Sequence, residues 1–496
     1  MTVPESSTES SITEGSLARP LFTLAWPIVV TQLLQVAYNI ADTIWLGRTA
    51  EPAAAVGALS LAFPLIFLLL SVGGGFTVAG STLVAQYTGA GGEESAGKAA
   101  GQTVAFVTVL AVALGVLGYL TTEPLLGLLP ADVETAAQVI PLASEYMRVF
   151  FLGTPFLFGF FVFSALMRGY GNTRTPMRVM FVTVVLNVVL DPLFIFGWQV
   201  GPAVTLFGHT LALDFPAMGV EGAAVATLIS RVVATGIGMY ILFGLRVGPD
   251  IRPEHLRLEL DWVKQIVDIG APSALEQSTS ALAMITLTAM VATFGPPVVA
   301  AYGLGNRLIS LVFLPAMGLG RATNTMVGQN LGADKADRAE RAVKLAGGVG
   351  AAVMFGVALV ALAFAEPIVS VFIQSTTADA ARTVEEGTRY LRIRTVEFAF
   401  IGVLQVLLGA YRGAGNTKTA LVFSLTALWV GRVPTVYYLA FVAGLGATGI
   451  WYGMALGNIV GAVAAGAWFT RGTWKRSVVD TDDAGAEVGP TPDAED

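Results

Sequence analysis

The stretches MRGYGNTRT at residues 167–175 and YRGAGNTKT at residues 411–419 are two copies of one motif, and they decide the fold. The copies agree at six of nine positions and lie 244 residues apart, since 411 − 167 = 244. Glycine suits left-handed turn backbone, Asn and Thr suit the cap of a following helix, and Arg or Lys suits an inner membrane surface. We therefore read both copies as tight cytoplasmic turns.

Two further pairs of segments keep nearly the same spacing. VAQYTGA at residues 84–90 matches VGQNLGA at residues 327–333, an offset of 327 − 84 = 243. The third pair is a proline with a glutamine five residues later, Pro27 with Gln32 and Pro272 with Gln277. Three pairs in register over more than 140 residues indicate that the chain consists of two related halves.

The second turn superficially resembles a phosphate-binding loop, in the stretch GAGNTKT at residues 413–419. A phosphate loop requires glycine directly before the lysine, and Thr417 stands there instead. The motif therefore does not predict an ATP-driven motor.

The composition places both halves in a membrane. Of the 496 residues, 54% are apolar and 13% charged, against roughly 25% charged in an ordinary soluble domain. There is no cysteine and there are only two histidines, which argues against disulfides, thiol chemistry and typical zinc sites. We predict an all-α integral membrane protein with no cofactor.

Twelve apolar stretches are long enough to cross about 30 Å of hydrocarbon, which takes roughly 20 residues of helix. They lie at about 21–47, 54–82, 99–121, 138–163, 177–198, 219–245, 262–293, 297–320, 343–366, 387–410, 419–443 and 446–470. Six per half is an even number, so the two lobes have the same orientation and are pseudo-symmetric about an axis along the membrane normal.

The predicted organisation has five parts. These are an acidic, disordered N-terminal tail (1–20), an N-terminal six-helix lobe (21–245), a cytoplasmic linker (246–262), a C-terminal six-helix lobe (263–470) and an acidic C-terminal tail (471–496). Of the 28 Lys and Arg residues, 19 fall in segments on the side of the termini, three on the other side and six within the spans. This bias predicts that both termini are cytoplasmic, in a multi-pass protein of the cell membrane.

Two carboxylates inside the first lobe are the main functional candidates, because an ionised group at mid-bilayer costs at least about 2.5–3.5 kcal/mol. Asp42 lies in the first span, where Asn39 is expected on the same face with Gln35 and Tyr38 nearby. Asp191 lies in the fifth span, one helical turn after its amide neighbour, which is Asn187.

A pair of buried carboxyl groups could bind either of two ions. A medium of low dielectric constant favours the protonated carboxyl, so the pair could carry H⁺, and with amide and hydroxyl oxygens it could instead bind Na⁺. Both acids also have a structural alternative. Asp42 could lie near the outer interface within reach of Arg48, and the Asp–Pro step of Asp191 with Pro192 also suits a helix break. The repeat places Leu287 opposite Asp42 and Thr435 opposite Asp191, so the acidic pair belongs to one half only.

The second half contains two more acids inside its spans. Glu276 lies one turn after Pro272 and has no partner at helical spacing, which favours a function. Glu397 stands three residues after Arg394, so it forms a local ion pair or serves a function of its own.

Taken together, these motifs resemble the multidrug and toxic compound extrusion (MATE) family, and most closely its DinF-like branch. The motifs are QxxYNxxD at 35–42, RGxGNT in both halves, LNxxLDP at 186–192 and GAAxAT at 222–227. The resemblance covers about residues 20–470, which is everything except the tails.

The resemblance implies two lobes in a V and export of amphipathic, often cationic organic compounds against inward H⁺ or Na⁺ flow, by alternating access. It also implies an ion-coupling network in the N-terminal lobe and a proline involved in bending the first helix, which matches Pro27. The residues that match the network are Asp42, Asn187, Asp191 and Thr227, with Gln35 and Tyr38 close by. Glu276 occupies roughly the position of an acid on which other branches rely. Five residues are expected to support the network or line the substrate cleft: Gln35, Tyr38, Asn39, Pro27 and Glu276. We expect small organic molecules, H⁺ or Na⁺, and membrane lipid as partners, no nucleic acid, and a monomer.

Two other functions are weighed against export. A flippase for lipid-linked saccharides would need a cationic cleft, for which the arginines within the spans are candidates: Arg148, Arg231, Arg307 and Arg432. An intramembrane prenyl transferase would need clustered metal-binding acids such as DDxxD, and adjacent acids in the body occur only at 93–94 and 385–386, near loops. We therefore predict a transporter, not an enzyme.

Overall fold

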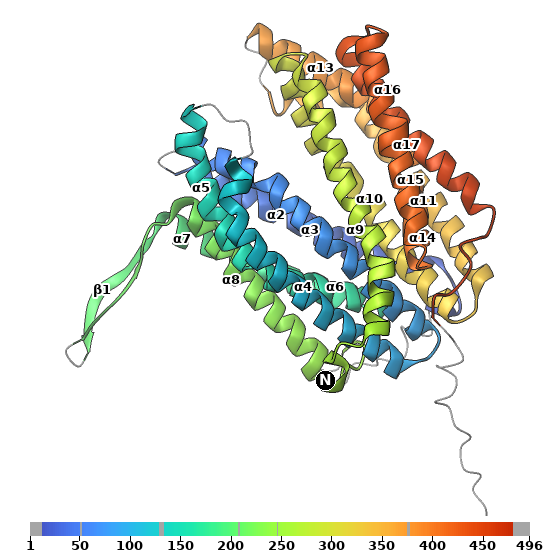
Figure 1. Ribbon diagram of the computed structural model, residues 1–496. Helices are drawn as coiled ribbons and strands as arrows, with labels where there is room; N and C mark the ends of the chain where they lie inside the picture. The colour runs from blue at the N-terminus through green and yellow to red at the C-terminus, as the bar shows by residue number, and fades with distance from the viewer. Residues whose placement is uncertain are drawn as a thin grey trace, which may run out of the picture.

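The computed structural model describes residues 12–49, 52–127, 133–206, 209–245, 247–373 and 377–479. It consists of two helical lobes that touch at one end and diverge toward the other, as Figure 1 shows. The predicted helical membrane fold with two six-helix halves is therefore confirmed. The outermost residues of both acidic tails, 1–11 and 480–496, lie outside the described residues.

The N-terminal lobe contains six spans, one of which is bent. Its helices are α2 (Ala18–Leu46), α3 (Pro52–Gly89), α4 (Glu93–Gly127), α5 (Val133–Leu152), α6 (Thr154–Gly169), α7 (Arg174–Phe196), and α8 (Gly219–Met239) with its π-helical end η2 (Tyr240–Leu245). Helices α5 and α6 together form one span, bent by 53°. The bend falls at Gly153, just before Pro155, which has no N–H to continue the ladder of α5.

The C-terminal lobe repeats this plan after a 3-10 turn, η3 (Pro253–Leu256), in the linker. Its elements are α9 (Leu260–Ala292), α10 (Pro296–Gly332), α11 (Ala336–Ala363), α12 (Ala365–Ser370), α13 (Ala378–Arg394), η4 (Thr395–Glu397), α14 (Phe398–Gly413), α15 (Thr417–Leu425), η5 (Thr426–Arg432), α16 (Val433–Tyr437), η6 (Tyr438–Val442) and α17 (Gly446–Phe469). Ten spans of the described chain are long and apolar enough to cross a membrane, and the bent pair is an eleventh. Helix α9, with 33 residues, completes the repeat.

Two helices run further than their apolar stretches predict. Helix α10 continues to Gly332, twelve residues past the expected end at 320, and its counterpart α3 continues to Gly89 instead of 82. The added turns carry the polar glutamines Gln86 and Gln329, whose side chains bind the opposite lobe instead of facing lipid. Hydropathy marks the part of a helix inside hydrocarbon, so it missed these ends.

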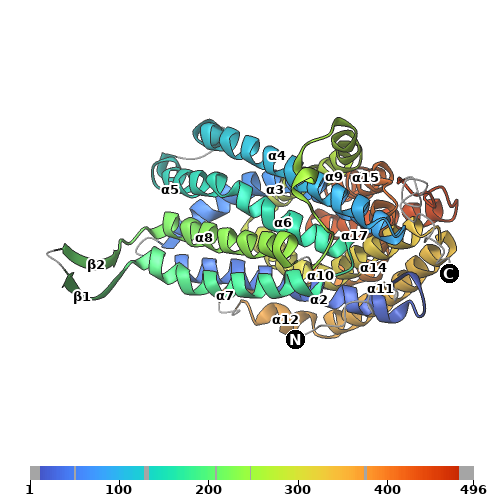
Figure 2. The ribbon, with the colours of Figure 1, turned by 90° about the horizontal axis from the view of Figure 1, so that it is seen from below.

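Within the described ranges, a β-hairpin is the one departure from the all-helical prediction. Strand β1 (Trp198–Leu206) pairs antiparallel with β2 (His209–Phe215), with an irregularity between Val200 and Val204. That irregularity contains Pro202, which cannot donate a ladder hydrogen bond. The hairpin joins α7 to α8 at the end remote from the RGxGNT turns, and Figures 1 and 2 both show it projecting from the helices.

Both RGxGNT segments form the predicted turns. Gly171 and Gly415 have φ angles of 99° and 74°, in the region that favours glycine. The side-chain oxygen of Asn172 accepts a hydrogen bond from the Thr175 amide, and Asn416 accepts one from the corresponding amide in the second turn. The repeat in sequence is therefore a repeat in structure.

These turns also join the lobes. The hydroxyl of Thr82 and the side-chain amide of Gln86, both on α3, donate to the carbonyl oxygens of Arg412 and Gly413 at 2.9 Å each. Helix α10 makes the matching pair of bonds on the other side: Thr325 donates to the Arg168 carbonyl and Gln329 to the Gly169 carbonyl, each at 3.0 Å. We call this set of four bonds the seam.

Glycines bring the backbones together at the seam. A Cβ atom added at Gly332 would lie 1.8 Å from the carbonyl oxygen of Gln86, and one at Gly89 would lie 2.0 Å from that of Gln329. A side chain at either position would therefore separate the two long helices.

Both described ends of the chain lie beside the seam. The carbonyl oxygen of Ile12 accepts from Asn330 at 3.3 Å, on the C-terminal lobe. The amide of Val478 donates to the side-chain oxygen of Gln86 at 2.9 Å, on the N-terminal lobe. The described ends therefore share one end of the molecule, as an even number of spans requires. Helix α2 begins at Ala18, three residues before the predicted lobe boundary.

Candidate ion-coupling site

The two N-lobe carboxylates come together inside the lobe. Asp42 on α2 is 5% exposed, and Asn187 and Asp191 on α7 are fully buried. The amide nitrogen of Asn187 donates to a carboxylate oxygen of Asp191 at 2.5 Å and lies 3.5 Å from one of Asp42. Helix α7 stays continuous through Pro192, so the Asp–Pro step does not break the helix.

A third helix completes this cluster. The Tyr38 hydroxyl on α2 donates to the Thr227 hydroxyl on α8 at 2.6 Å, and both residues are buried. Four residues after Thr227, the buried Arg231 stacks over the Tyr38 ring, 5.2 Å from its centroid. Arg231 also donates to the side-chain oxygen of Gln35 at 3.1 Å. The cluster therefore holds two acids, one guanidinium and several neutral polar groups.

Several polar atoms in this cluster have no partner. The buried side-chain oxygens Asn187 Oδ1 and Asp191 Oδ2 accept no hydrogen bond, and neither the hydroxyl of Ser230 nor Nε of Arg231 has a partner. An unpaired buried acceptor costs about 1–3 kcal/mol. One of these two oxygens belongs to the carboxyl pair itself and the other to the Asn187 amide that contacts both carboxyl groups, so a proton or a cation could satisfy them.

Asn39 differs from its prediction. It is exposed, and its side-chain oxygen accepts from Gln35 at 3.3 Å instead of meeting Asp42. Residues three apart on a helix are rotated by about 60°, enough to place one inside and one at the surface. Pro27 is buried within α2, where its carbonyl accepts from Thr31 at 2.7 Å.

Arg231 belongs to this cluster, although the sequence did not lead us to predict it there. Its signal was present, because an arginine inside an apolar span, one turn after Thr227, lies on the same helical face. The other three arginines proposed for a flippase cleft lie in different surroundings. Arg148 pairs with Glu123, Arg307 is exposed and Arg432 faces Glu397.

Glu276 lies apart from this cluster and has a partner that helical spacing could not predict. It is buried on α9, and Arg412 on α14 binds both of its carboxylate oxygens, with Nη2 to Oε1 at 2.6 Å and Nε to Oε2 at 3.2 Å. Two parallel bonds of this kind are strong and geometrically specific.

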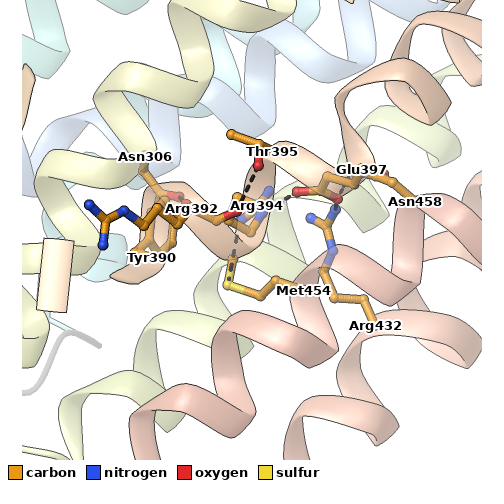
Figure 3. A network of polar contacts seen from close by, with 9 residues as sticks. All are labelled: Asn306, Tyr390, Arg392, Arg394, Thr395, Glu397, Arg432, Met454 and Asn458. Carbon is orange, nitrogen blue, oxygen red and sulfur yellow. Dashed lines mark hydrogen bonds and ion pairs between the residues drawn. The ribbon is translucent and has the colours of Figure 1, made fainter. Parts of the chain in front are cut away.

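Glu397 belongs to a paired network inside the C-terminal lobe, drawn in Figure 3. It forms the predicted ion pair with Arg394, accepts from Asn458 at 2.7 Å and lies 3.9 Å from Arg432. Arg394 in turn donates to the Tyr390 hydroxyl at 2.9 Å. The network spans the η4 interruption between α13 and α14, so it ties an irregular span to its neighbours.

Comparison with known proteins identifies the family. The MatE family profile matches residues 27–193 and 272–438, one match in each lobe, and the two matches start 245 residues apart, as the repeat requires. The chain belongs to the MATE family. Members of this family are transporters, which excludes the enzyme alternative. The DinF-like branch stays a prediction.

Known relatives match almost the whole chain. The probable multidrug resistance protein YpnP of Bacillus subtilis is 30% identical over 463 residues, covering 93% of this chain and 97% of that protein. An FAD transporter of Shewanella oneidensis is 27% identical, and the match covers 90% of this chain and 93% of that protein. A solved MATE multidrug resistance transporter in an outward-facing conformation is 26% identical, covers 95% and 99%, and superposes with a TM-score of 0.81. These names do not favour the flippase alternative.

Proposed function

We propose that this MATE transporter is a secondary active exporter in the cell membrane, with its seam end cytoplasmic. In this proposal it moves amphipathic organic compounds, cationic ones among them, against inward flow of H⁺ or Na⁺. The ion binds at the cluster of Asp42, Asn187, Asp191 and Thr227, with Tyr38 and Gln35 beside it. The positive-inside bias supports this orientation.

One observation supports the coupling site: the buried carboxyl groups of Asp42 and Asp191 both approach the Asn187 amide, and one oxygen of Asp191 and the amide oxygen of Asn187 have no donor. Neighbouring carboxylates repel, so a proton or cation between them lowers the energy of the pair. The described residues contain no group of three His, Cys, Asp or Glu side chains, so Na⁺ here would also need amide and hydroxyl oxygens.

Helix α2 connects this site to the lobe interface. Asp42 lies on its second half, while Gln32, ten residues and about 15 Å earlier, accepts from Arg321 of the other lobe at 3.1 Å. Gly318 of α10 packs against Val29 of α2 nearby. A shift of α2 on ion binding would therefore change contacts between the lobes, with Pro27 as the point where the helix bends most easily.

Transport then proceeds by competition between ion and substrate. With the lobes open outward, ion binding at Asp42 and Asp191 favours a state of lower substrate affinity, and substrate leaves. The lobes rock, the ion dissociates inside, and substrate binds again. The ion drives this cycle only because it binds the two states with different affinities.

The test is efflux of a fluorescent organic cation from proteoliposomes, driven separately by a pH gradient and a Na⁺ gradient. We expect one gradient to drive efflux in the wild type and Asp42→Asn to abolish it. Asn39→Ala, three residues away but exposed, is the matched control and should keep wild-type efflux. Undiminished efflux in Asp42→Asn would move the coupling site to Glu276. No efflux from any of the proteins, under either gradient, would contradict antiport.

A further inference from the structure

Three arginines gather where the lobes meet, on the side of the seam toward the diverging ends. Thr325 bonds the Arg168 carbonyl across the interface, and Arg321 lies one turn before Thr325 on the same helix. Gly413, the neighbour of Arg412, packs on the backbone of Asn324, three residues after Arg321, so like charges from both lobes come close together here. We call Arg168, Arg321 and Arg412 the arginine cluster.

Among the described residues, one acid pairs with this cluster. Glu276 is bound by Arg412, so three guanidinium groups and one carboxylate leave a net charge of 3 − 1 = +2. Arg168 donates to the Ser164 hydroxyl and Arg321 to the Gln32 amide oxygen. In the part of the chain that the structure describes, neither of these two arginines has a carboxylate partner.

The internal repeat shows that this excess charge is specific to one side. Arg168 and Arg412 are repeat mates, 244 residues apart. The acid that pairs Arg412 is Glu276, and its mate at offset 245 is Thr31, whose hydroxyl is bonded to the Pro27 carbonyl. The first half therefore keeps the arginine and lacks the acid.

All three arginines are half-buried. Unpaired cations in such a place are costly, and a bound anion would offset the cost. Guanidinium groups bind carboxylate and phosphate through paired, charge-assisted hydrogen bonds. The cluster draws side chains from both lobes, so one anion would contact both.

We propose that the arginine cluster binds an anionic group, a carboxylate or a phosphate, of the transported substrate. The inference rests on the proposed export function and narrows its substrates: an amphipathic molecule carrying such a group, zwitterions included, binds better than a plain cation. Because the anion contacts both lobes, its arrival and departure also bias their separation.

Binding to the purified full chain tests this without any ion gradient. The probes are a dansyl-labelled alkyl phosphate, the matched trimethylammonium and the matched neutral alcohol, measured by fluorescence anisotropy. We expect the phosphate to bind most tightly, and Arg168→Gln and Arg321→Gln each to weaken it about tenfold, as expected for one charge-assisted interaction. Arg307→Gln, an exposed arginine outside the cluster, is the matched control.

Glu276→Gln should change the phosphate affinity in the opposite direction. The substitution raises the net charge of the arginine cluster to +3 and frees Arg412, so phosphate should bind more tightly. Arg168→Lys and Arg321→Lys keep the positive charge and should lose less phosphate affinity than the Gln variants. This comparison separates the effect of charge from any damage to folding. Wild-type affinity for the Gln variants, or equal losses for the trimethylammonium probe, would overturn the proposal.

Competition identifies the source of the phosphate. Displacement of the probe by lysophosphatidic acid alone indicates a lipid headgroup, and displacement also by soluble 4-methylumbelliferyl phosphate indicates that the phosphate suffices. Displacement by neither compound would contradict an anion site. Asp42→Asn should keep phosphate binding. Phosphate binding without antiport would contradict the proposed function alone, and antiport without phosphate binding would contradict the anion site alone.

Discussion

Placing a methyl group at Gly332 should open the seam. In Gly332→Ala, the new Cβ would stand 1.8 Å from the Gln86 carbonyl oxygen, and the next atoms it meets are also backbone. No rotamer can relieve such a clash. Ordinary contact begins near 3.4 Å, so α3 and α10 must separate by about 3.4 − 1.8 = 1.6 Å there.

That separation is enough to break the neighbouring hydrogen bonds. The bonds from Gln86 and Gln329, now 2.9 and 3.0 Å, would lengthen to about 4.5 Å, beyond any useful hydrogen-bond distance. At about 1 kcal/mol net for each bond, the closed seam loses about 2 kcal/mol. The population with the seam open should rise about 30-fold relative to the closed one, at 1.4 kcal/mol per factor of ten.

The absence of cysteine makes the measurement direct. Spin labels at Glu93→Cys and Arg341→Cys, both exposed and on opposite lobes at the seam end, report the lobe separation by double electron–electron resonance. Gly332→Ala should move the distance distribution to longer values. Gly348→Ala, a helical glycine with nothing within 4 Å of its added Cβ, should leave it unchanged. A wild-type distribution in folded Gly332→Ala would refute this account of the seam.

Three further predictions concern the lobes themselves. Arg231→Gln removes the guanidinium that stacks over Tyr38 and binds Gln35 in the Asp42 cluster, so gradient-driven efflux should fall severalfold; wild-type efflux in the folded variant would contradict this role. Glu397→Gln strands the buried Arg394 and should lower stability by about 3 kcal/mol, seen as a reduced midpoint in thermal unfolding of the detergent-solubilised protein. Asn416→Ala removes the cap of α15 and should cost only about 1 kcal/mol in the same assay, so a loss as large as that of Glu397→Gln would show that the turn does more than cap.

Repeats and buried charge made much of the fold and site predictable. The RGxGNT turns could be inferred because glycine and asparagine serve specific backbone needs there. Asp42 and Asp191 could be singled out because an ionised group in hydrocarbon is costly wherever it lies. The distance between the two carboxyl groups depends on how α2 packs on α7. The sequence does not determine that packing.

Other features depend on tertiary contacts that no local pattern encodes. The partner of Glu276 lies 136 residues away, so helical spacing could not find it. Arg321 was assigned to a cytoplasmic segment, but α10 continues eleven residues past it, and it faces the other lobe. The hairpin between α7 and α8 projects from the helices, and a search for apolar spans does not predict such an element.

The two described chain ends are exchanged between the lobes. Ile12, which precedes the N-terminal lobe, packs in a core with Leu319 and Met326 of the other, while Val479, which follows the C-terminal lobe, packs in a core with residues of the first. Each lobe therefore carries an end segment, or arm, that packs on the other lobe. Two separately expressed fragments, divided within residues 247–259, should reassemble, because each carries the arm that recognises the other.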